Sequence, residues 1–110
     1  MRKRLIILST LVLSLSCIPA RAQTATYYAS HFHGKRTASG VVFNNHAKMA
    51  AHPSLAFGTR IKVTNRNNGK SVVVKVVDRC RCSLDLSQAA FQSIGALRSG
   101  RLPVTIQILN

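Results

Sequence analysis

Asp78 and Asp85 are the only acidic residues in the chain, which contains no glutamate. Two carboxyl groups are too few for an EF-hand calcium loop, a two-metal phosphoryl-transfer site or a carboxylate-bridged di-metal bundle. They are enough for general acid–base catalysis, in which a carboxyl group gives or takes a proton. We therefore predict that any acid–base catalysis in this protein uses Asp78, Asp85, the four histidines or the backbone.

Each aspartate also has a structural interpretation. Asp78 precedes Arg79, and its carboxylate could pair with that guanidinium or accept hydrogen bonds from backbone amides of a loop. Asp85 lies close to the start of a predicted helix, where aspartate is favoured as a cap. A general acid must keep its proton near neutral pH, which requires burial or a like-charged neighbour. Arg79 opposes this at Asp78, so catalysis there requires an apolar wall, which the preceding valines could supply.

The histidines are further candidates. His52, which precedes Pro53, is predicted to orient substrate or relay a proton, and the alternative is a hydrogen-bonded structural residue. His31 and His33 share one face of an extended chain and, with His46 or His52, could hold a metal. No metal-ligand spacing repeats in the sequence, so we predict neither a metal nor another cofactor.

The N-terminal segment has the pattern of a signal peptide. Residues 2–4 are basic, Leu5–Leu15 is apolar, and Ala20-Arg21-Ala22 fits a cleavage site. The apolar run is too short for a membrane-spanning helix. The sequence therefore predicts a signal peptide over 1–22, a single domain over 23–110, and export to the periplasm or cell envelope.

The three cysteines differ in their expected roles. Lipid anchoring through Cys17 is the less favoured alternative to cleavage after Ala22, because the preceding residues fit a lipid-attachment site poorly. For Cys80 and Cys82 a disulfide, a redox-active dithiol and a share in a zinc site all remain open. An oxidising compartment favours the disulfide, which would stiffen the segment between Asp78 and Asp85.

Mostly strands are expected to position these residues. Residues with alternating or β-branched patterns predict strands at Thr24–Tyr28, Arg60–Thr64, Lys70–Val77, Leu84–Leu86 and Val104–Leu109. The valine-rich strand is expected to be mostly buried on both faces.

Turn and cap residues complete the pattern. Asn68-Gly69 predicts a hairpin, and Ser30–Asn45 is a long loop of the kind that is usually functional. Ser87 can cap a helix over Gln88–Ile94, which Gly95 would end. Short strands, one hairpin and one helix predict a small all-β closed barrel.

Three ordered stretches carry a family resemblance. They are Tyr27-Tyr28-Ala29 with Phe32–Gly40, Ala50–Thr59 with the following hairpin, and Val77-Asp78-Arg79 with Leu84–Phe91. Together these stretches resemble the RlpA-like (rare lipoprotein A) lytic transglycosylases, over about residues 24–109, and more distantly the expansin and barwin barrels. The resemblance implies a six-stranded double-psi β-barrel that cleaves peptidoglycan glycan strands between N-acetylmuramic acid and N-acetylglucosamine, without water, and favours strands stripped of peptides.

The sequence departs from the family at informative positions. Val41 stands where the family carries a glutamate held to be important for activity, and Asn44 where it often has aspartate. The family positions of His52 and Asp78 are kept, and Asp85 matches an aspartate of expansin-like barrels. We therefore predict that Asp78 is the acid and base of the reaction and that Asp85 and His52 position the substrate. The departures favour an alternative function, a non-catalytic protein that binds or loosens glycan, and a cationic secreted defence domain is a third class.

The charge indicates the kind of partner. Lysines and arginines number 16, and the net charge is +14, which predicts salt-dependent binding to polyanions. Export and the lack of a readout helix argue against nucleic acid. Peptide-free glycan exposes a carboxylate on each muramic acid, so we predict that this glycan binds a monomer, with anionic lipids or teichoic-type polymers as the alternative. The predicted substrate-binding residues are Tyr28, Phe32, Lys35, Arg36, Arg79 and Arg81.

Overall fold

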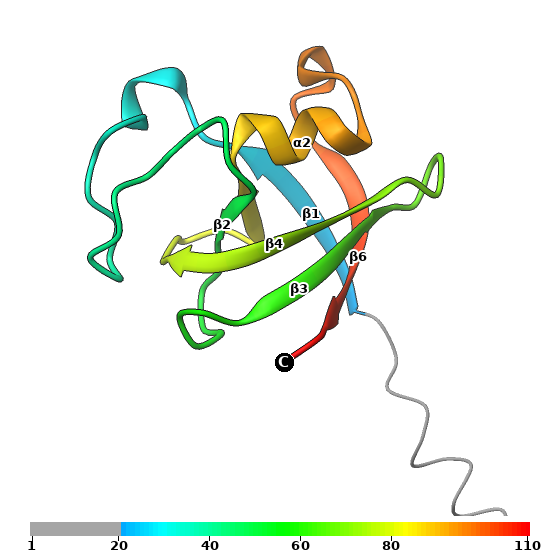
Figure 1. The fold of residues 1–110 in the computed structure, drawn as a ribbon. Coiled ribbons are helices and arrows are strands. Elements are labelled where there is room, and N and C mark those ends of the chain that lie inside the picture. The colour runs from blue at the N-terminus through cyan, green and yellow to red at the C-terminus, as the bar shows by residue number, and fades with distance from the viewer. Residues whose placement is uncertain (1–20) are drawn as a thin grey trace, which may run out of the picture.

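The computed structural model describes residues 21–110, in which six strands close into a barrel (Figure 1). Around the barrel the strands follow the order β1-β5-β2-β4-β3-β6. The elements are β1 (Arg21–Tyr27), η1 (Ser30–Phe32), β2 (Met49–Ala51), β3 (Arg60–Asn65), β4 (Ser71–Asp78), β5 (Leu84–Leu86), α2 (Gln88–Ile94), η2 (Leu97–Ser99) and β6 (Leu102–Ile108). The predicted all-β, six-stranded barrel with one short α-helix is confirmed.

Most of the predicted signal peptide, including Cys17, lies outside the described residues. Arg21 and Ala22, which precede the predicted cleavage point, begin β1 and pair with β6. Cleavage after Ala22 would therefore remove the first two pairings of β1 and keep those from Gln23 onward. The boundary between residues 22 and 23 stays a prediction.

Parallel strand pairs join distant parts of the chain. β1 runs parallel to β5, and β2 runs parallel to β4. β3 and β4 form the antiparallel hairpin predicted from Asn68-Gly69, and Gly69 has a φ of 76°, which glycine adopts at little cost. β6 pairs with both β1 and β3 and so closes the barrel.

Strand β4 differs from its sequence-based prediction. Val74 and Val76 point into the barrel and are buried, but Lys75 is exposed and Val73 is 38% exposed. Only one face of this half of the strand meets the core, as is common in antiparallel hairpins. The prediction that both faces are mostly buried is therefore wrong for this half.

Helix α2 lies over one end of the barrel (Figure 1). The Ser87 side chain accepts a hydrogen bond from the backbone N–H of Ala90, and Gly95 follows the last helical residue, as predicted. Phe91 and Ile94 are fully buried and join the inward side chains of all six strands in one core. Within residues 21–110, no helix is both long and apolar enough to cross a membrane.

The predicted loop over residues 30–45 is held in place by its own turns and by the barrel. It contains η1, and the turn over residues 37–40 docks on the end of β4, where the N–H of Ser39 donates to the carbonyl of Val77 over 3.1 Å. This docking brings the loop against the strand that carries Asp78.

Candidate active site

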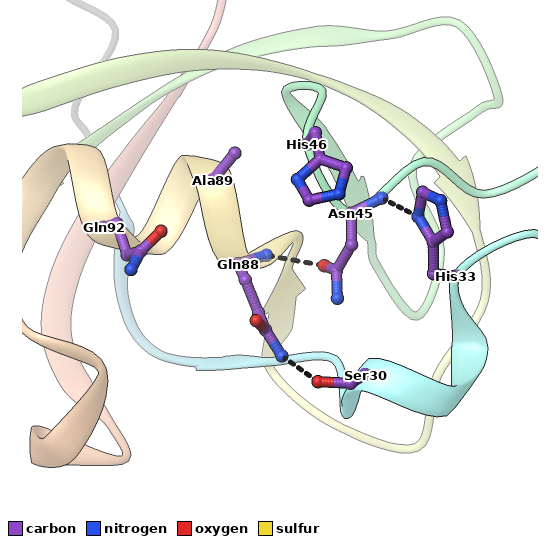
Figure 2. Close-up of a pocket in the computed structure, with 7 residues that line it drawn as sticks. All are labelled: Ser30, His33, Asn45, His46, Gln88, Ala89 and Gln92. Carbon is purple, nitrogen blue, oxygen red and sulfur yellow. Dashed lines mark hydrogen bonds between the residues drawn. The ribbon is translucent and has the colours of Figure 1, made fainter.

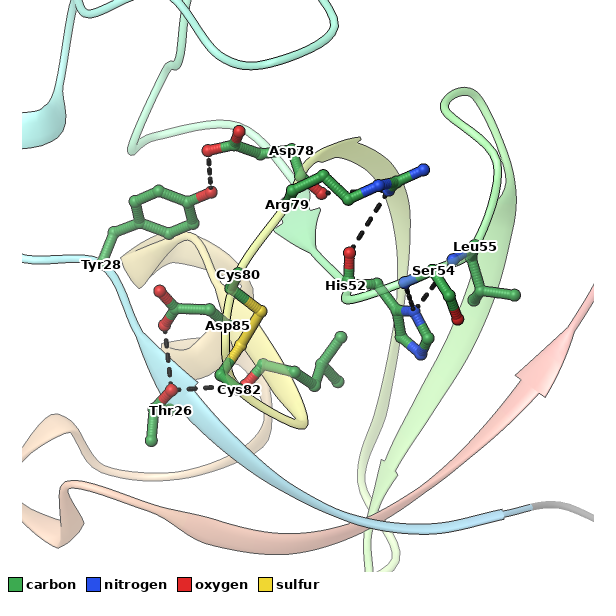
Figure 3. The surroundings of a disulfide bond; sticks show 11 residues. Thr26, Tyr28, His52, Ser54, Leu55, Asp78, Arg79, Cys80, Cys82 and Asp85 are labelled. Carbon is green, nitrogen blue, oxygen red and sulfur yellow. Dashed lines mark hydrogen bonds between the residues drawn. A yellow bond between two sulfur atoms is a disulfide. The ribbon is translucent and has the colours of Figure 1, made fainter.

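Asp78 and Asp85 are brought together by β2, which lies between their strands (Figure 3). Ala51 of β2 is opposite Asp78 on one side and opposite Asp85 on the other. Since neighbouring strands lie about 4.8 Å apart, the two aspartate Cα atoms are separated by about 10 Å. Leu84 and Leu86 fill the barrel core, so the alternation of β5 turns Asp85 to the outer face. The only two carboxylates of the chain therefore share one site.

The Asp78 carboxylate is held by two donors from the N-terminal part of the barrel. The Tyr28 hydroxyl donates to Oδ2 over 2.7 Å, and the backbone N–H of Ala38 donates to Oδ1 over 2.8 Å. Burial raises the pKa of the Tyr28 phenol, and its hydrogen bond to Asp78 raises that pKa further. Tyr28 therefore stays protonated and remains a donor across the physiological range.

The Asp85 carboxyl lies in a different environment. Burial raises its pKa above the ordinary value of 3.8, a hydrogen bond from the Thr26 hydroxyl to Oδ1 over 3.0 Å lowers it in part, and the negative charge of Asp78 raises it again. Its proton is therefore retained to a higher pH than on a free aspartate, as a general acid requires.

The raised pKa of Asp85 predicts a pH-dependent stability cost. When folding raises the pKa of an acid, the protonated acid favours the folded state. This contribution to the free energy of unfolding is complete at a pH below the pKa of the unfolded chain, and it is lost as the pH rises through the pKa of the folded protein. We expect Asp85→Asn to raise the melting temperature at pH 7, and not at pH 3, because asparagine carries no charge to bury. Scanning calorimetry of both proteins at the two pH values measures this, and an equal difference at both would contradict it.

Arg79 is directed away from the Asp78 carboxylate. Its guanidinium donates to the backbone carbonyls of His52 and Asp78 over 3.3 and 3.4 Å, and it lies 4.1 Å from the centre of the Phe57 ring. Phe57 is itself 42% exposed, so the stacked pair is accessible to solvent. The sequence suggested an ion pair between Asp78 and Arg79. In the structure the Arg79 guanidinium instead makes a cation–π contact with Phe57.

His52 is buried and supports a turn. Its Nδ1 accepts hydrogen bonds from the backbone N–H groups of Ser54 and Leu55 over 3.0 and 3.1 Å. Burial lowers the pKa of His52, and the nearby charge of Arg79 lowers it further, so the ring is neutral. Figure 3 shows the ring turned toward this turn and away from the two aspartates. The backbone N–H of His52 donates to the carbonyl of Asp78 over 3.1 Å, so the two residues are neighbours, but the imidazole ring does not join the two carboxyl groups.

Cys80 and Cys82 are joined by a disulfide in the segment that links Asp78 to Asp85 (Figure 3). Cys80 packs against the small outer cluster of Tyr28, Phe43 and Ala51, which lies beneath the aspartates. In the part of the chain that the structure describes, no three His, Cys, Asp or Glu side chains gather as a metal site would require.

The predicted substrate-binding residues fall into two groups. Tyr28 is buried and its ring stacks on Phe43, with the ring centres 3.9 Å apart, so it supports Asp78 rather than presenting an open face to a sugar. Phe32, in contrast, is 42% exposed and meets the Tyr28 ring edge to face. The remaining predicted residues, Lys35, Arg36, Arg79 and Arg81, are all exposed.

Two partners of the aspartates were missed by the sequence reasoning. Thr26 is one of many strand threonines, and its role depends on the parallel register that sets it opposite Asp85. Ala38 contributes only a backbone N–H, which no side-chain pattern can indicate. The only sequence feature that could have indicated this contact is the turn-forming stretch Thr37–Gly40.

The fold and the site together define a class of protein: a small closed β-barrel that carries two carboxyl groups on its outer face. Residues 20–106 match the family model described as lytic transglycolase. The chain belongs to this double-psi β-barrel family, as the resemblance implied.

Two relatives differ in how much of their own length this chain matches. One, "Uncharacterized protein ssl3177" of Synechocystis sp., is 58% identical over 85 residues, which cover 77% of this chain and 94% of that protein. The other, "Probable endolytic peptidoglycan transglycosylase RlpA" of Aquifex aeolicus, is 46% identical over 89 residues, which cover 77% of this chain and 39% of that protein. The chain thus spans well under half of the Aquifex protein.

Solved structures agree on the fold. The Streptomyces papain inhibitor has a TM-score of 0.69 at 24% identity, over 84% of this chain and 96% of that one. A mutant Clavibacter michiganensis expansin in complex with cellohexaose has a TM-score of 0.66 at 24% identity, over 84% of this chain and 51% of that one. At these identities the likeness concerns the fold alone.

Proposed function

We propose that the protein is an exported endolytic peptidoglycan transglycosylase. It cleaves the bond between N-acetylmuramic acid and N-acetylglucosamine in glycan strands stripped of peptides, and it leaves 1,6-anhydromuramic ends. The observation that carries the proposal is the pairing of Asp78 with Asp85 across Ala51, with burial raising the pKa of Asp85. The names of relatives such as the Aquifex protein support the same reaction.

The proposed reaction needs one acid and no bound water. Asp85 donates its proton to the glycosidic oxygen, and the bond between that oxygen and C1 of the muramic residue breaks. The 6-hydroxyl of the same residue bonds to C1, and its proton passes to the Asp85 carboxylate, which restores the acid. Sequence reasoning gave this role to Asp78; we now assign it to Asp85, because Asp85 has the raised pKa. Asp78 contributes the charge that raises this pKa further.

His52 and the exposed cations take supporting roles. We propose that His52 is a positioning residue, since its Nδ1 accepts two amides of the 54–55 turn and its carbonyl accepts from Arg79. Lys35, Arg36 and Arg81 are exposed, and they bind the muramic carboxylates of the glycan. Export is supported by the basic and apolar pattern of the N-terminal segment and by the disulfide, which an oxidising compartment maintains.

The direct test is digestion of peptide-free glycan strands, followed by mass spectrometry of the products. Anhydromuramic ends are expected, and hydrolytic reducing ends are not. Intact peptidoglycan serves as the matched substrate and should be cleaved more slowly. Binding to the strands without any anhydro product would contradict the enzymatic proposal.

A glutamate at position 41, where the family carries one and this chain has valine, tests whether that carboxyl group increases activity. Val41 is 45% exposed and directly follows the turn whose Ala38 N–H binds Asp78. We expect Val41→Glu to raise the rate of anhydro-end formation about tenfold, because it adds a carboxylate beside the site. The matched control is Val42→Glu at the neighbouring position, which is 47% exposed and should leave the rate unchanged. Equal effects of both substitutions would indicate a general charge effect.

One observation favours the alternative of a non-catalytic glycan-binding protein. The stretch where the family carries its glutamate here presents two exposed valines, Val41 and Val42. The fold is also that of the mutant Clavibacter expansin in complex with cellohexaose. In this case the protein would bind glycan strands with the same affinity before and after Asp85→Asn and would yield no product with either.

A further inference from the structure

A pocket at the start of α2 takes no part in the proposed reaction. It has a volume of about 320 Å³ and lies between η1, the 45–46 segment and one face of α2 (Figure 2). Its lining residues are Ser30, His33, Asn45, His46, Gln88, Ala89 and Gln92. The lining includes no acidic or basic side chain other than the two histidines, and its ligand must therefore be recognised mainly by hydrogen bonds.

Asn45 has a fixed orientation in this pocket. Its Oδ1 accepts a hydrogen bond from the backbone N–H of Gln88 over 2.7 Å, which assigns the oxygen to the helix side and the amide nitrogen to the other side. The residue is only 6% exposed, and within residues 21–110 its Nδ2 has no hydrogen-bond partner. Figure 2 shows this nitrogen directed toward the space above Ser30. A buried, unpaired amide destabilises the fold unless water or a ligand satisfies it.

The neighbouring side chains offer both donors and an acceptor. His33 Nδ1 accepts from the backbone N–H of Asn45 over 3.0 Å, so the proton of the neutral ring is on Nε2, which is a donor. This state disfavours a metal ligand, whose coordinating nitrogen carries no proton. Gln88 Nε2 donates to the Tyr28 carbonyl and to Ser30, which leaves the Gln88 Oε1 as an acceptor.

We propose that this pocket binds the 2-acetamido group of an N-acetylated sugar. The acetamido carbonyl accepts from Asn45 Nδ2, its N–H donates to an amide oxygen of Gln88 or Gln92, and its methyl group lies against the Ala89 side chain. Gln88 and Gln92 are four residues apart on α2 and so face the same way. A hydroxyl in place of the acetamido group could accept from Asn45, but it is too short to reach the glutamines as well, and it has no methyl group to cover Ala89.

The pocket is linked to the aspartates through Tyr28. The backbone carbonyl of Tyr28 accepts from Gln88, and the hydroxyl of the same residue donates to Asp78. Tyr28 therefore contacts a lining residue of the pocket with its backbone and Asp78 with its side chain. The choice of ligand rests on the proposed function, and the pocket would select the acetylated backbone of peptidoglycan over other glucans.

Two trisaccharides test the proposal with the wild-type protein. Chitotriose carries a 2-acetamido group on each sugar, and cellotriose has a hydroxyl there. Neither has a carboxylate, so charge does not contribute. In ¹H–¹⁵N spectra, we expect saturable shifts of the Asn45 side-chain NH₂ with chitotriose and none with cellotriose. Equal shifts with both, or shifts with neither, would overturn the proposal.

A pair of substitutions isolates the Asn45 amide. Asn45→Asp keeps the oxygen that accepts from Gln88 and removes the unpaired NH₂, so chitotriose affinity should fall about tenfold. The matched control, Asn44→Asp, makes the same charge change outside the pocket, where Oδ1 accepts from the His46 N–H over 2.9 Å. Its affinity for chitotriose should stay as in wild type. Equal losses would refute a role for the Asn45 amide, and Gln92→Leu, on an exposed helix position, gives a second variant if Asn45→Asp does not fold.

The pocket and the reaction can fail separately. Chitotriose binding without anhydro products would retain the acetamido pocket and refute the transglycosylase. Anhydro products without any shift of the Asn45 signals would retain the transglycosylase and refute the acetamido pocket.

Discussion

Replacing Asp85 with asparagine is expected to lower the rate of anhydro-end formation by about 10²- to 10⁴-fold, the range typical for loss of a general acid. Asparagine has nearly the shape of aspartic acid, and its oxygen can still accept from Thr26. It has no proton to donate to the glycosidic oxygen. Rates measured on peptide-free glycan should therefore collapse, while co-sedimentation of the protein with the strands is retained.

Asp78→Asn is the matched comparison within the same site. It removes the negative charge that contributes to the raised pKa of Asp85, so the pH above which activity falls should move downward. The loss at neutral pH should be smaller than for Asp85→Asn. If Asp78→Asn abolishes product formation and Asp85→Asn does not, the acid is Asp78 and our assignment is wrong.

Phe91→Ala is expected to have the largest effect on stability. The Phe91 ring is fully buried at the end of the barrel, where it meets Tyr27 edge to face with the ring centres 4.8 Å apart. Truncation of a buried phenylalanine lowers the free energy of unfolding by about 3–5 kcal/mol. A domain of this size buries a modest core, so the variant should be largely unfolded at 37 °C.

Urea unfolding followed by circular dichroism measures this loss. Ser93→Ala, an exposed position on the same helix, is the control and should change the free energy of unfolding by no more than about 0.5 kcal/mol. A loss below about 1 kcal/mol for Phe91→Ala would mean that α2 is not part of the folding core.

Local signals predicted much of the fold. Asn68-Gly69, Ser87 and Gly95 act through turn and cap geometry within a few residues, and the hairpin and the helix follow as predicted. The sequence gives no definite prediction for the segment 47–52, which contains β2, because the three residues of that strand are too few for a periodic pattern. The parallel pairs β1–β5 and β2–β4 join distant segments, and no local pattern indicates them.

The site was predicted by residue type but not by geometry. Asp78 and Asp85 were identified because no other acid exists in the chain. Their roles depend on burial and on donors from β1 and the 37–40 turn, which only the folded structure brings near. The direction of Arg79 toward Phe57 and the unpaired amide of Asn45 are likewise tertiary features.

The position of β6 between β1 and β3 has a consequence for how the chain acquires its shape. The strand that completes the ring is the last of the six to leave the ribosome, and until then β1 and β3 have open edges. Since distant pairings must form together, we expect native structure to arise only after synthesis has passed Ile108, on a timescale of about milliseconds to seconds. The nascent polypeptide would therefore stay unfolded, though not fully extended, until the last strand is available.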